Sequence, residues 1–387
     1  MTIGTKESVL GSVATSRRSL MKLAGLGAGA LSTAGLTGGI ASAASKSERI
    51  DPDALAIMSS NENPFGPSPK AMEAMRAEVG NIYRYARPAT KAFQEMIAAK
   101  EGVSPEQVLI ANGSSPLLGA FAEWAAAQEG ELLTSALTYE GVPRVAKFYN
   151  MPINAAPLDA EMGYDLDEMA KRLSKKKTAA VYLCNPNNPT GKTMDPVKMR
   201  AFAIEAAKVA PVFIDEAYLE VSEDYPAGVM SDLVAEGHNV MIARTFSKVY
   251  AMAGQRIGYA IAPTSLIEKM GDSGRLSSVN HLGLVGAMAA YQDQLYFEEM
   301  RMRNIRGRNM LVEMAKDLGR PIAPSPQGTF IWMDVGMENA KFAEKMLEKG
   351  VKVVGARWPE APEWTRICVG LDHEIEKCHA AAKAVLA

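Results

Sequence analysis

The segment RTFSKVYAMAGQRIGYA, residues 244–260, holds a lysine beside a hydroxyl group with a second cation nearby. Lys248 directly follows Ser247, and Arg256 lies further along the same segment. A lysine that is partly desolvated and close to other cations has a depressed pKa, so it can attack an aldehyde as a nucleophile. Ser247 and Arg256 can hold a phosphate. The segment therefore predicts a Schiff base between Lys248 and a phosphorylated aldehyde.

A second motif, FIDEAY at residues 213–218, indicates the kind of ring that carries this aldehyde. Asp215 follows an apolar strand, where an unpaired carboxylate is costly, so we expect a cationic partner for it. A protonated pyridine nitrogen would serve, and the carboxylate would keep that nitrogen protonated. A buried salt bridge and a Mg²⁺ ligand are the alternatives. Tyr218 could donate to a phenolic oxygen on the same ring.

Two turn motifs supply further polar groups. Ser114 and Ser115 in NGSSP (112–116) follow a strand and open a helix, whose free N–H groups form a phosphate site, although simple helix capping explains them as well. Asn188 in NPNNPTG (185–191) can donate to a ring oxygen, or can serve the turn alone. Because ligands collect at the carboxyl ends of parallel strands, we expect all these motifs to meet there. Together they predict pyridoxal phosphate as the cofactor.

The composition excludes several other classes of protein. The 387 residues are 48% hydrophobic and 22% charged, as in ordinary globular proteins, and the net charge is -2 at pH 7. No lysine- or arginine-rich run stands out, so we expect no nucleic-acid partner. Cys184, Cys368 and Cys378 have no CxxC spacing and no ligand-spaced histidines nearby. A disulfide framework and a bound metal are therefore not expected.

The N-terminal residues 1–43 have the pattern of an export signal rather than of a folded element. Arg17 and Arg18 lie in SRRSLMK, a weakly apolar Gly/Ala-rich stretch follows, and Ala41-Ser42-Ala43 fits a cleavage site. We therefore expect export by the twin-arginine machinery, cleavage near Ala43 and a periplasmic location. A disordered basic tail and an uncleaved membrane anchor are the alternatives.

The rest of the chain alternates short apolar runs with helical patterns. This alternation predicts an α/β fold with a mostly parallel sheet covered on both faces. We expect an N-terminal arm at 44–80, a large cofactor-binding domain at 81–300 and a small α/β C-terminal domain at 301–387. A single long helix is predicted at about 286–318.

From about residue 55 to its C-terminus the chain resembles the class I and II aminotransferases, which are fold-type I pyridoxal-phosphate enzymes, and most of all their histidinol-phosphate aminotransferase branch. The motifs NENPFGPSP (61–69), GVSPEQVLIANGSS, NPNNPTG, DEAY, TFSK…AGQRIGY and RICVG occur in the family's order and spacing. The resemblance implies a seven-stranded type of sheet and a homodimer with shared active sites.

The resemblance also implies roles for individual residues. Lys248 would bond the cofactor and later move a proton, Asp215 would pair with the ring nitrogen, and Tyr218 and Asn188 would contact the ring hydroxyl oxygen. Tyr139 would stack on the ring, and Arg366 would bind the acidic group of the substrate. Tyr85 would reach the phosphate of the partner subunit. The implied phosphate ligands within the subunit are Ser114, Ser115, Thr245, Ser247 and Arg256.

The function that follows is transfer of an amino group from an amino acid or small amine to a 2-oxo acid by a ping-pong mechanism. A decarboxylase, a lyase or an amino-acid oxidase on the same fold is the alternative within the cofactor class. A binding scaffold would not need Lys248. A nicotinamide-dependent dehydrogenase is disfavoured because no GxGxxG motif follows a strand after the signal.

The sequence departs from the family pattern on the substrate side. Where the branch has an arginine after the GV-x-V strand, this chain has Val354, with Arg357 and Trp358 shortly after it. Where the branch has RYPDP this chain has RYARP, and where the branch usually has Asn-Phe this chain has Thr329-Phe330. Arg357 could meet a second carboxylate, a phosphate or an aromatic substrate edge, or could be a surface arginine on a loop.

Overall fold

The computed structural model describes residues 55–270, 276 and 278–387. The predicted export signal at 1–43, with Arg17, Arg18 and the cleavage site at Ala43, lies outside the described residues, as does the start of the N-terminal arm. No helix in the described residues combines the length and the apolar character that crossing a membrane requires.

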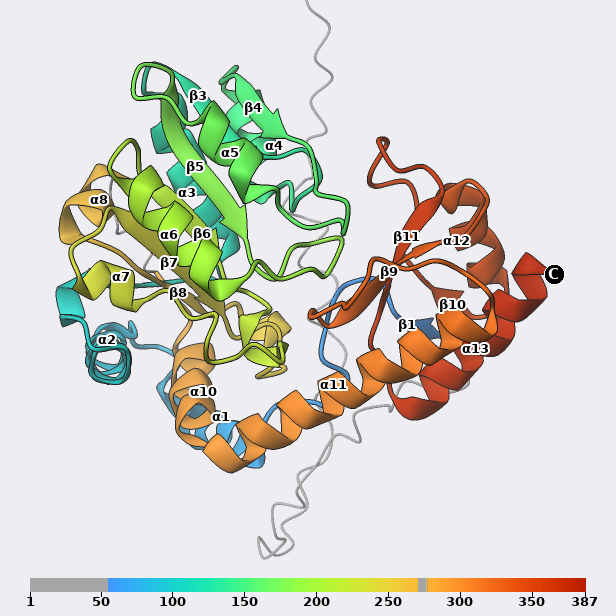
Figure 1. Cartoon of the computed structure of the whole chain (residues 1–387). Coiled ribbons are helices and arrows are strands. Elements are labelled where there is room, and N and C mark those ends of the chain that lie inside the picture. The colour runs from blue at the N-terminus through green and yellow to red at the C-terminus, as the bar shows by residue number, and fades with distance from the viewer. Residues whose placement is uncertain (1–54, 271–275, 277) are drawn as a thin grey trace, which may run out of the picture. The chain divides into compact units, whose positions relative to one another are not determined.

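A seven-stranded sheet forms the centre of the cofactor-binding part of the chain (Figure 1). The strands from β7 through β6, β5 and β3 to β4 are all parallel, whereas β8 runs antiparallel to both of its neighbours. The predicted α/β fold with a mostly parallel sheet is therefore confirmed. In spatial order the strands are β2 (Val108–Ala111), β8 (Gly258–Ile261), β7 (Val240–Thr245), β6 (Val212–Asp215), β5 (Thr178–Cys184), β3 (Glu131–Ser135) and β4 (Ile153–Ala156).

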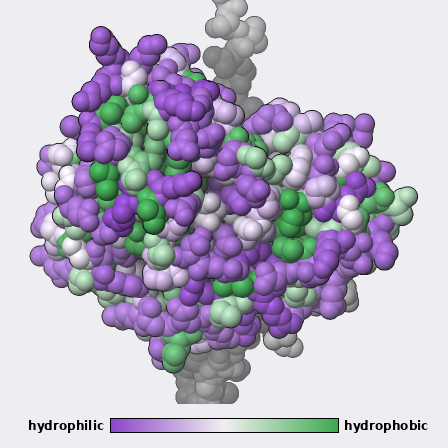
Figure 2. Space-filling model, viewed as in Figure 1, coloured by the Kyte–Doolittle hydropathy of each residue, from purple (hydrophilic) through white to green (hydrophobic). Residues whose placement is uncertain are grey.

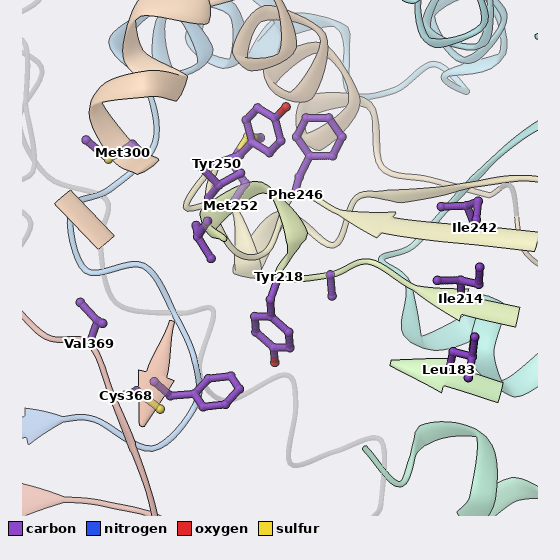
Figure 3. Close-up of a cluster of buried hydrophobic side chains, with 14 of the residues drawn as sticks. Leu183, Ile214, Tyr218, Ile242, Phe246, Tyr250, Met252, Met300, Cys368 and Val369 are labelled. Carbon is purple, nitrogen blue, oxygen red and sulfur yellow. The ribbon is translucent and has the colours of Figure 1, made fainter. Parts of the chain in front are cut away.

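Helices bury both faces of this sheet because successive residues of a strand point to opposite sides. In β6, Phe213 packs against Phe121 of α3, with ring centroids 5.0 Å apart, while Ile214 belongs to the core on the other face together with Phe202 of α6. Figure 3 shows Ile214 on its strand next to Leu183 and Ile242. The flanking helices are α2 (Arg87–Glu101), α3 (Ser115–Ala126), α4 (Gly141–Phe148), α5 (Leu166–Arg172), α6 (Pro196–Ala207), α7 (Asp232–Ala235) and α8 (Thr264–Lys269).

The C-terminal residues form two small sheets with helices beside them. Strand β9 (Phe330–Asp334) pairs antiparallel with β11 (Trp364–Cys368), and β10 (Val351–Lys352) pairs in parallel with β1 (Ala56–Ile57). The start of the described chain thus joins the C-terminal strands. Helices α12 (Asn339–Glu348) and α13 (Asp372–Leu386) complete this part. The domain boundaries at residues 80 and 300 stay predictions.

The prediction of one long helix at 286–318 is wrong. Helix α10 (His281–Gln292) and helix α11 (Gln294–Asp317) are separate, and they run in different directions in Figure 1. The break lies at Asp293, whose φ of -86° and ψ of 69° are not helical. Its carboxylate accepts a hydrogen bond of 2.9 Å from Nζ of Lys70, a residue of α1 (Pro69–Glu78). A tertiary ion pair therefore accompanies the break, and the sequence has no proline or glycine there.

The surface is largely polar on the face that Figure 2 shows, with apolar residues in small scattered groups. Among the exposed large apolar side chains of the described residues, four lie within one short segment: Val79, Ile82, Tyr83 and Tyr85. This segment lies between α1 and α2.

Candidate active site

A cavity of about 350 Å³ lies where the polar motifs of the sequence meet. All of the predicted cofactor-binding residues of the subunit itself line it, as do both predicted substrate-binding arginines. Only Tyr85 does not. The lining residues are Ser60, Asn61, Glu62, Ser114, Ser115, Tyr139, Asn188, Asp215, Ala217, Tyr218, Thr245, Ser247, Lys248, Ala253, Gly254, Arg256, Arg357 and Arg366.

One end of the cavity is built to hold an anion. Ser114 and Ser115 stand at the N-terminus of α3, where backbone N–H groups have no partner within the helix. Arg256 donates to Ser247 Oγ at 3.2 Å, and Thr245 Oγ1 is 3.0 Å from the same hydroxyl oxygen. Donors and a cation thus converge on one spot, which fits a phosphate.

The backbone at this end allows a very close approach. Gly113 has a φ of +83°, and a Cβ atom added there would stand 2.4 Å from Arg256 Nη2. Arg256 itself has a φ of 54°, which is uncommon for a residue other than glycine and is found mainly at functional sites. Only glycine at position 113 therefore leaves the guanidinium group of Arg256 in its place.

The opposite end carries a buried carboxylate. Asp215, at the end of β6, is 3% exposed and accepts a hydrogen bond of 3.1 Å from the N–H of Ala217, while Tyr182 Oη lies 3.5 Å from its other oxygen. Burial raises the pKa of this carboxyl to about 6. Among the described residues, no lysine, arginine or histidine forms an ion pair with it. A cationic ring nitrogen would provide the missing partner.

Lys248 projects into the same cavity from the loop after β7. Its Nζ donates to the backbone carbonyl of Asn61 at 3.0 Å. Burial first, and the positive charge of Arg366 second, lower the pKa of this amine to about 8. A lysine with such a pKa is partly neutral near physiological pH, and only the neutral amine is a nucleophile. The catalytic role of Lys248 stays a prediction, which this environment supports.

Two asparagine side chains contact the phenolic oxygen of Tyr218. Asn61 Nδ2 donates to it at 2.7 Å, and Asn188 Nδ2 lies 3.4 Å away. Figure 3 shows the Tyr218 ring directed away from the apolar cluster around Phe246. Asn61 belongs to the site but was not among the predicted site residues. Its signal was the motif NENP, which predicts an extended arm and does not by itself reveal where the arm lies.

On the substrate side, Arg366 comes from β11 and is 2% exposed. It donates from Nη1 to Asn188 Oδ1 at 2.7 Å and from Nη2 to the carbonyl oxygen of Ser59 at 2.9 Å. No carboxylate forms an ion pair with it in the described part of the chain. Its charge is therefore available to an acidic ligand.

Arg357 and Tyr85, the two remaining predicted site residues, are placed differently from the residues inside the cavity. Arg357 lies at the rim, where Nε donates to Glu140 Oε1 at 3.1 Å and Nη2 bonds the same oxygen. It is neither free in the cavity nor a bare surface arginine. Tyr85 is 89% exposed and does not line this cavity. Its predicted role in the site of a partner subunit stays a prediction.

The fold and the site together define a pyridoxal-phosphate-dependent transferase of fold type I. The sequence matches the family model "Aminotransferase class I and II" over residues 55–385. The chain therefore belongs to the class I and II aminotransferase family.

Relatives and solved structures agree with this assignment. The chain is 33% identical over 340 residues to histidinol-phosphate aminotransferase 2 of Pseudomonas fluorescens, covering 87% of this chain and 90% of that protein. A structure described as a putative histidinol-phosphate aminotransferase from Erwinia carotovora atroseptica superimposes with a TM-score of 0.80 at 29% identity, over 85% of this chain and 95% of that one. The structure of histidinol-phosphate aminotransferase from Sinorhizobium meliloti in complex with pyridoxal-5'-phosphate superimposes with a TM-score of 0.77 at 26% identity. The match covers 86% of this chain and 91% of that one. A decarboxylase, lyase or oxidase is not favoured.

Proposed function

We propose that this enzyme binds pyridoxal phosphate in the 350 Å³ cavity and moves an amino group from an amino acid or small amine to a 2-oxo acid. The observation that carries the proposal is the placement of three groups in one cavity. An anion site at α3, a buried carboxylate without a cationic partner and a lysine of lowered pKa are the groups that this cofactor requires.

The bound cofactor would supply an electron sink for the carbon that carries the amino group. Lys248 would bond the aldehyde carbon of the cofactor. When the donor has displaced it, its Nζ would carry a proton between the donor carbon that bears the amino group and the former aldehyde carbon. Asp215 would hold the ring nitrogen protonated. Arg366 would orient an amino-acid donor by binding the donor's carboxylate. In the best geometry the guanidinium group makes two parallel hydrogen bonds to the two carboxylate oxygens.

The relatives' names offer histidinol phosphate as the substrate, but this chain differs from that branch at two positions that the resemblance assigns to the substrate side. Val354 occupies the position of a branch arginine, and Thr329 occupies the position of an asparagine. Thr329 Oγ1 is buried and has no hydrogen-bond partner in the described part of the chain. We therefore infer that the donor is an amino acid or small amine and that its distal group differs from that of histidinol phosphate.

A covalent trap tests the central role of Lys248. Borohydride reduction of the cofactor-loaded enzyme should fix the cofactor on the peptide that contains Lys248, as peptide mass spectrometry reads out. Lys248→Ala should abolish this adduct and reduce turnover by about 10³-fold or more. Lys91→Ala, at an exposed lysine of α2, is the matched control and should keep both. An adduct on another lysine would refute the assignment.

The amino donor can be found by single turnover. Cofactor-loaded enzyme mixed with a panel of amino acids and amines should lose its visible absorption with the true donor, and pyruvate or 2-oxoglutarate should restore it. Turnover without any 2-oxo acid, with release of ammonia, CO₂ or peroxide, would contradict amino transfer.

A further inference from the structure

The two arginines on the substrate side of the cavity differ in their electrostatic state. Arg366 has no carboxylate partner among the described residues, whereas the guanidinium group of Arg357 is paired with Glu140. The net positive charge that faces a substrate therefore comes from Arg366. Arg357 adds little, because Glu140 neutralises it at hydrogen-bond distance.

The pair connects two different parts of the fold. Glu140 directly follows the predicted ring-stacking residue Tyr139 and precedes α4, whereas Arg357 lies on the loop between β10 and β11. The guanidinium carbon of Arg357 is 5.8 Å from the Tyr139 ring centroid and 5.2 Å from that of Trp358. The aromatic rings on either side hold the guanidinium group in this position at the rim.

Trp358 also connects the two cations. The guanidinium carbon of Arg366 lies 5.4 Å from the Trp358 ring centroid, so the indole contacts both arginines. A second cavity of about 390 Å³ lies beyond the pair and is lined by Arg357, Glu140 and Trp358, among others. Arg357 lines both cavities and Glu140 lines the second one, so a substrate whose distal group reached from the first cavity towards the second would meet this pair.

We propose that Glu140 is a specificity-determining residue, which neutralises Arg357 and so makes the enzyme select donors and acceptors with an uncharged distal group over dicarboxylic ones. A second carboxylate at this place would have to displace Glu140 or lie beside it, and like charges at such distances repel. Without the charge of Glu140, Arg357 would be a second carboxylate-binding cation. The inference rests on the proposed function, since it assigns the side-chain selectivity of that same site.

The test is Glu140→Gln, which keeps the size of the side chain and removes its charge. Succinate, a dicarboxylate without an amino group, should bind the cofactor-loaded variant about tenfold or more tightly than it binds the unaltered enzyme, as measured by calorimetry. The ratio of kcat/KM for glutamate to that for alanine should rise by a similar factor. Unchanged succinate affinity would overturn the inference.

Arg357 must be the cause of any gain. In the double variant Glu140→Gln/Arg357→Gln the tighter binding of succinate should disappear, and a gain that persists would also overturn the inference. Arg357→Gln alone leaves the charge of Glu140 without its partner, so it should weaken succinate binding; stronger binding would contradict the inference even if Glu140→Gln did not fold.

A matched control and a separate readout complete the design. Glu168→Gln breaks another arginine–glutamate pair, with Arg172 at 2.9 Å; neither residue of this pair lines either cavity, so succinate binding and the activity ratio should stay unchanged. Absence of amino transfer by the unaltered enzyme with every donor would refute the proposed function. Succinate binding would still decide the role of Glu140, because it needs no turnover.

Discussion

At the scale of single residues, the site brings together two groups whose pKa values are shifted towards each other. Burial raises the pKa of Asp215 to about 6 and lowers that of Lys248 to about 8. Both shifts disfavour the ionised form, because a buried charge without a close partner is unfavourable. A ligand with a cationic nitrogen for Asp215 and an aldehyde for Lys248 would relieve both penalties. The arrangement of these two groups thus favours cofactor binding and lowers the stability of the cofactor-free protein.

The first prediction is that Asp215→Asn separates stability from cofactor binding. The folded-state pKa of Asp215 lies above its unfolded value of 3.8, so its contribution to stability is fully present below pH 3.8 and is lost as pH rises through about 6. The loss is up to about 3 kcal/mol, at about 1.4 kcal/mol for each pKa unit. At pH 7.5 the cofactor-free variant should therefore be more stable than the parent by about 1–3 kcal/mol.

Urea unfolding between pH 4 and 8, with and without pyridoxal phosphate, measures both effects. Stabilisation by the cofactor should be smaller in the variant, because an amide cannot hold the ring nitrogen protonated. If the variant is less stable than the parent at pH 7.5 and keeps full cofactor affinity, the Asp215 carboxylate neither destabilises the cofactor-free protein nor contributes to cofactor binding.

At the scale of elements, strand ends and one helix start create the cofactor site. Strands β5, β6 and β7 are parallel, so their carboxyl ends deliver Asn188, Asp215 and Lys248, each in the residues at or after a strand end, to one edge. Helix α3 begins at the same edge and presents its N–H groups there. The catalytic constellation therefore depends on strand register and on the packing of one helix.

The second prediction concerns Gly113. Gly113→Ala would place a Cβ atom against Arg256 and should weaken phosphate-dependent binding of the cofactor by about tenfold or more, since Arg256 must move. Gly66→Ala is a matched control, because Gly66 has the same φ of +83° but no atom within 4 Å of the added Cβ. Both variants should lose about 1 kcal/mol of stability from backbone strain. Equal cofactor affinity in the two variants would show that Arg256 does not need its present position.

At the scale of the whole molecule, we expect a homodimer that uses the segment between α1 and α2. Val79, Ile82, Tyr83 and Tyr85 are exposed together there, and single large apolar residues are usually scattered instead. Tyr85 lies outside the cavity of its own subunit, as a residue that acts in a partner's site must.

The third prediction is that Ile82→Glu shifts the enzyme towards monomers in sedimentation experiments and weakens cofactor binding with it. Val197→Glu, at a valine of α6 that is more exposed than Ile82, should leave the sedimentation behaviour unchanged. Tyr85→Phe should lower cofactor affinity by about 1 kcal/mol, the usual value of one hydrogen bond, without affecting the dimer. A monomeric unaltered enzyme with full activity would exclude shared active sites.

The fourth prediction concerns export, which we propose from residues outside the described ones. Changing Arg17 and Arg18 to Lys should retain the enzyme in the cytoplasm, because twin arginines are the feature of the signal that this route reads. Cell fractionation with immunodetection measures the outcome, and the mass of the exported form tests cleavage near Ala43. Export that continues unchanged would refute the signal.

The sequence by itself determined the fold class, the cofactor motifs and their order. Apolar runs bounded by turn residues predict buried strands wherever both faces are covered, and the polar residues that follow them predict one shared edge. For this reason Lys248, Asp215, Asn188 and Tyr218 could be placed in one site before any coordinates. Local patterns of residues suffice for this step.

Only the tertiary structure decided which long-range partners these residues have. The arm carries Asn61 to Lys248 and Tyr218, Glu140 neutralises Arg357, and the contact with Lys70 accompanies the helix break at Asp293. None of these contacts has a sequence signal, because each joins residues far apart in the chain whose types are common in other settings. Their energies depend on distance and burial, which arise only when the elements pack.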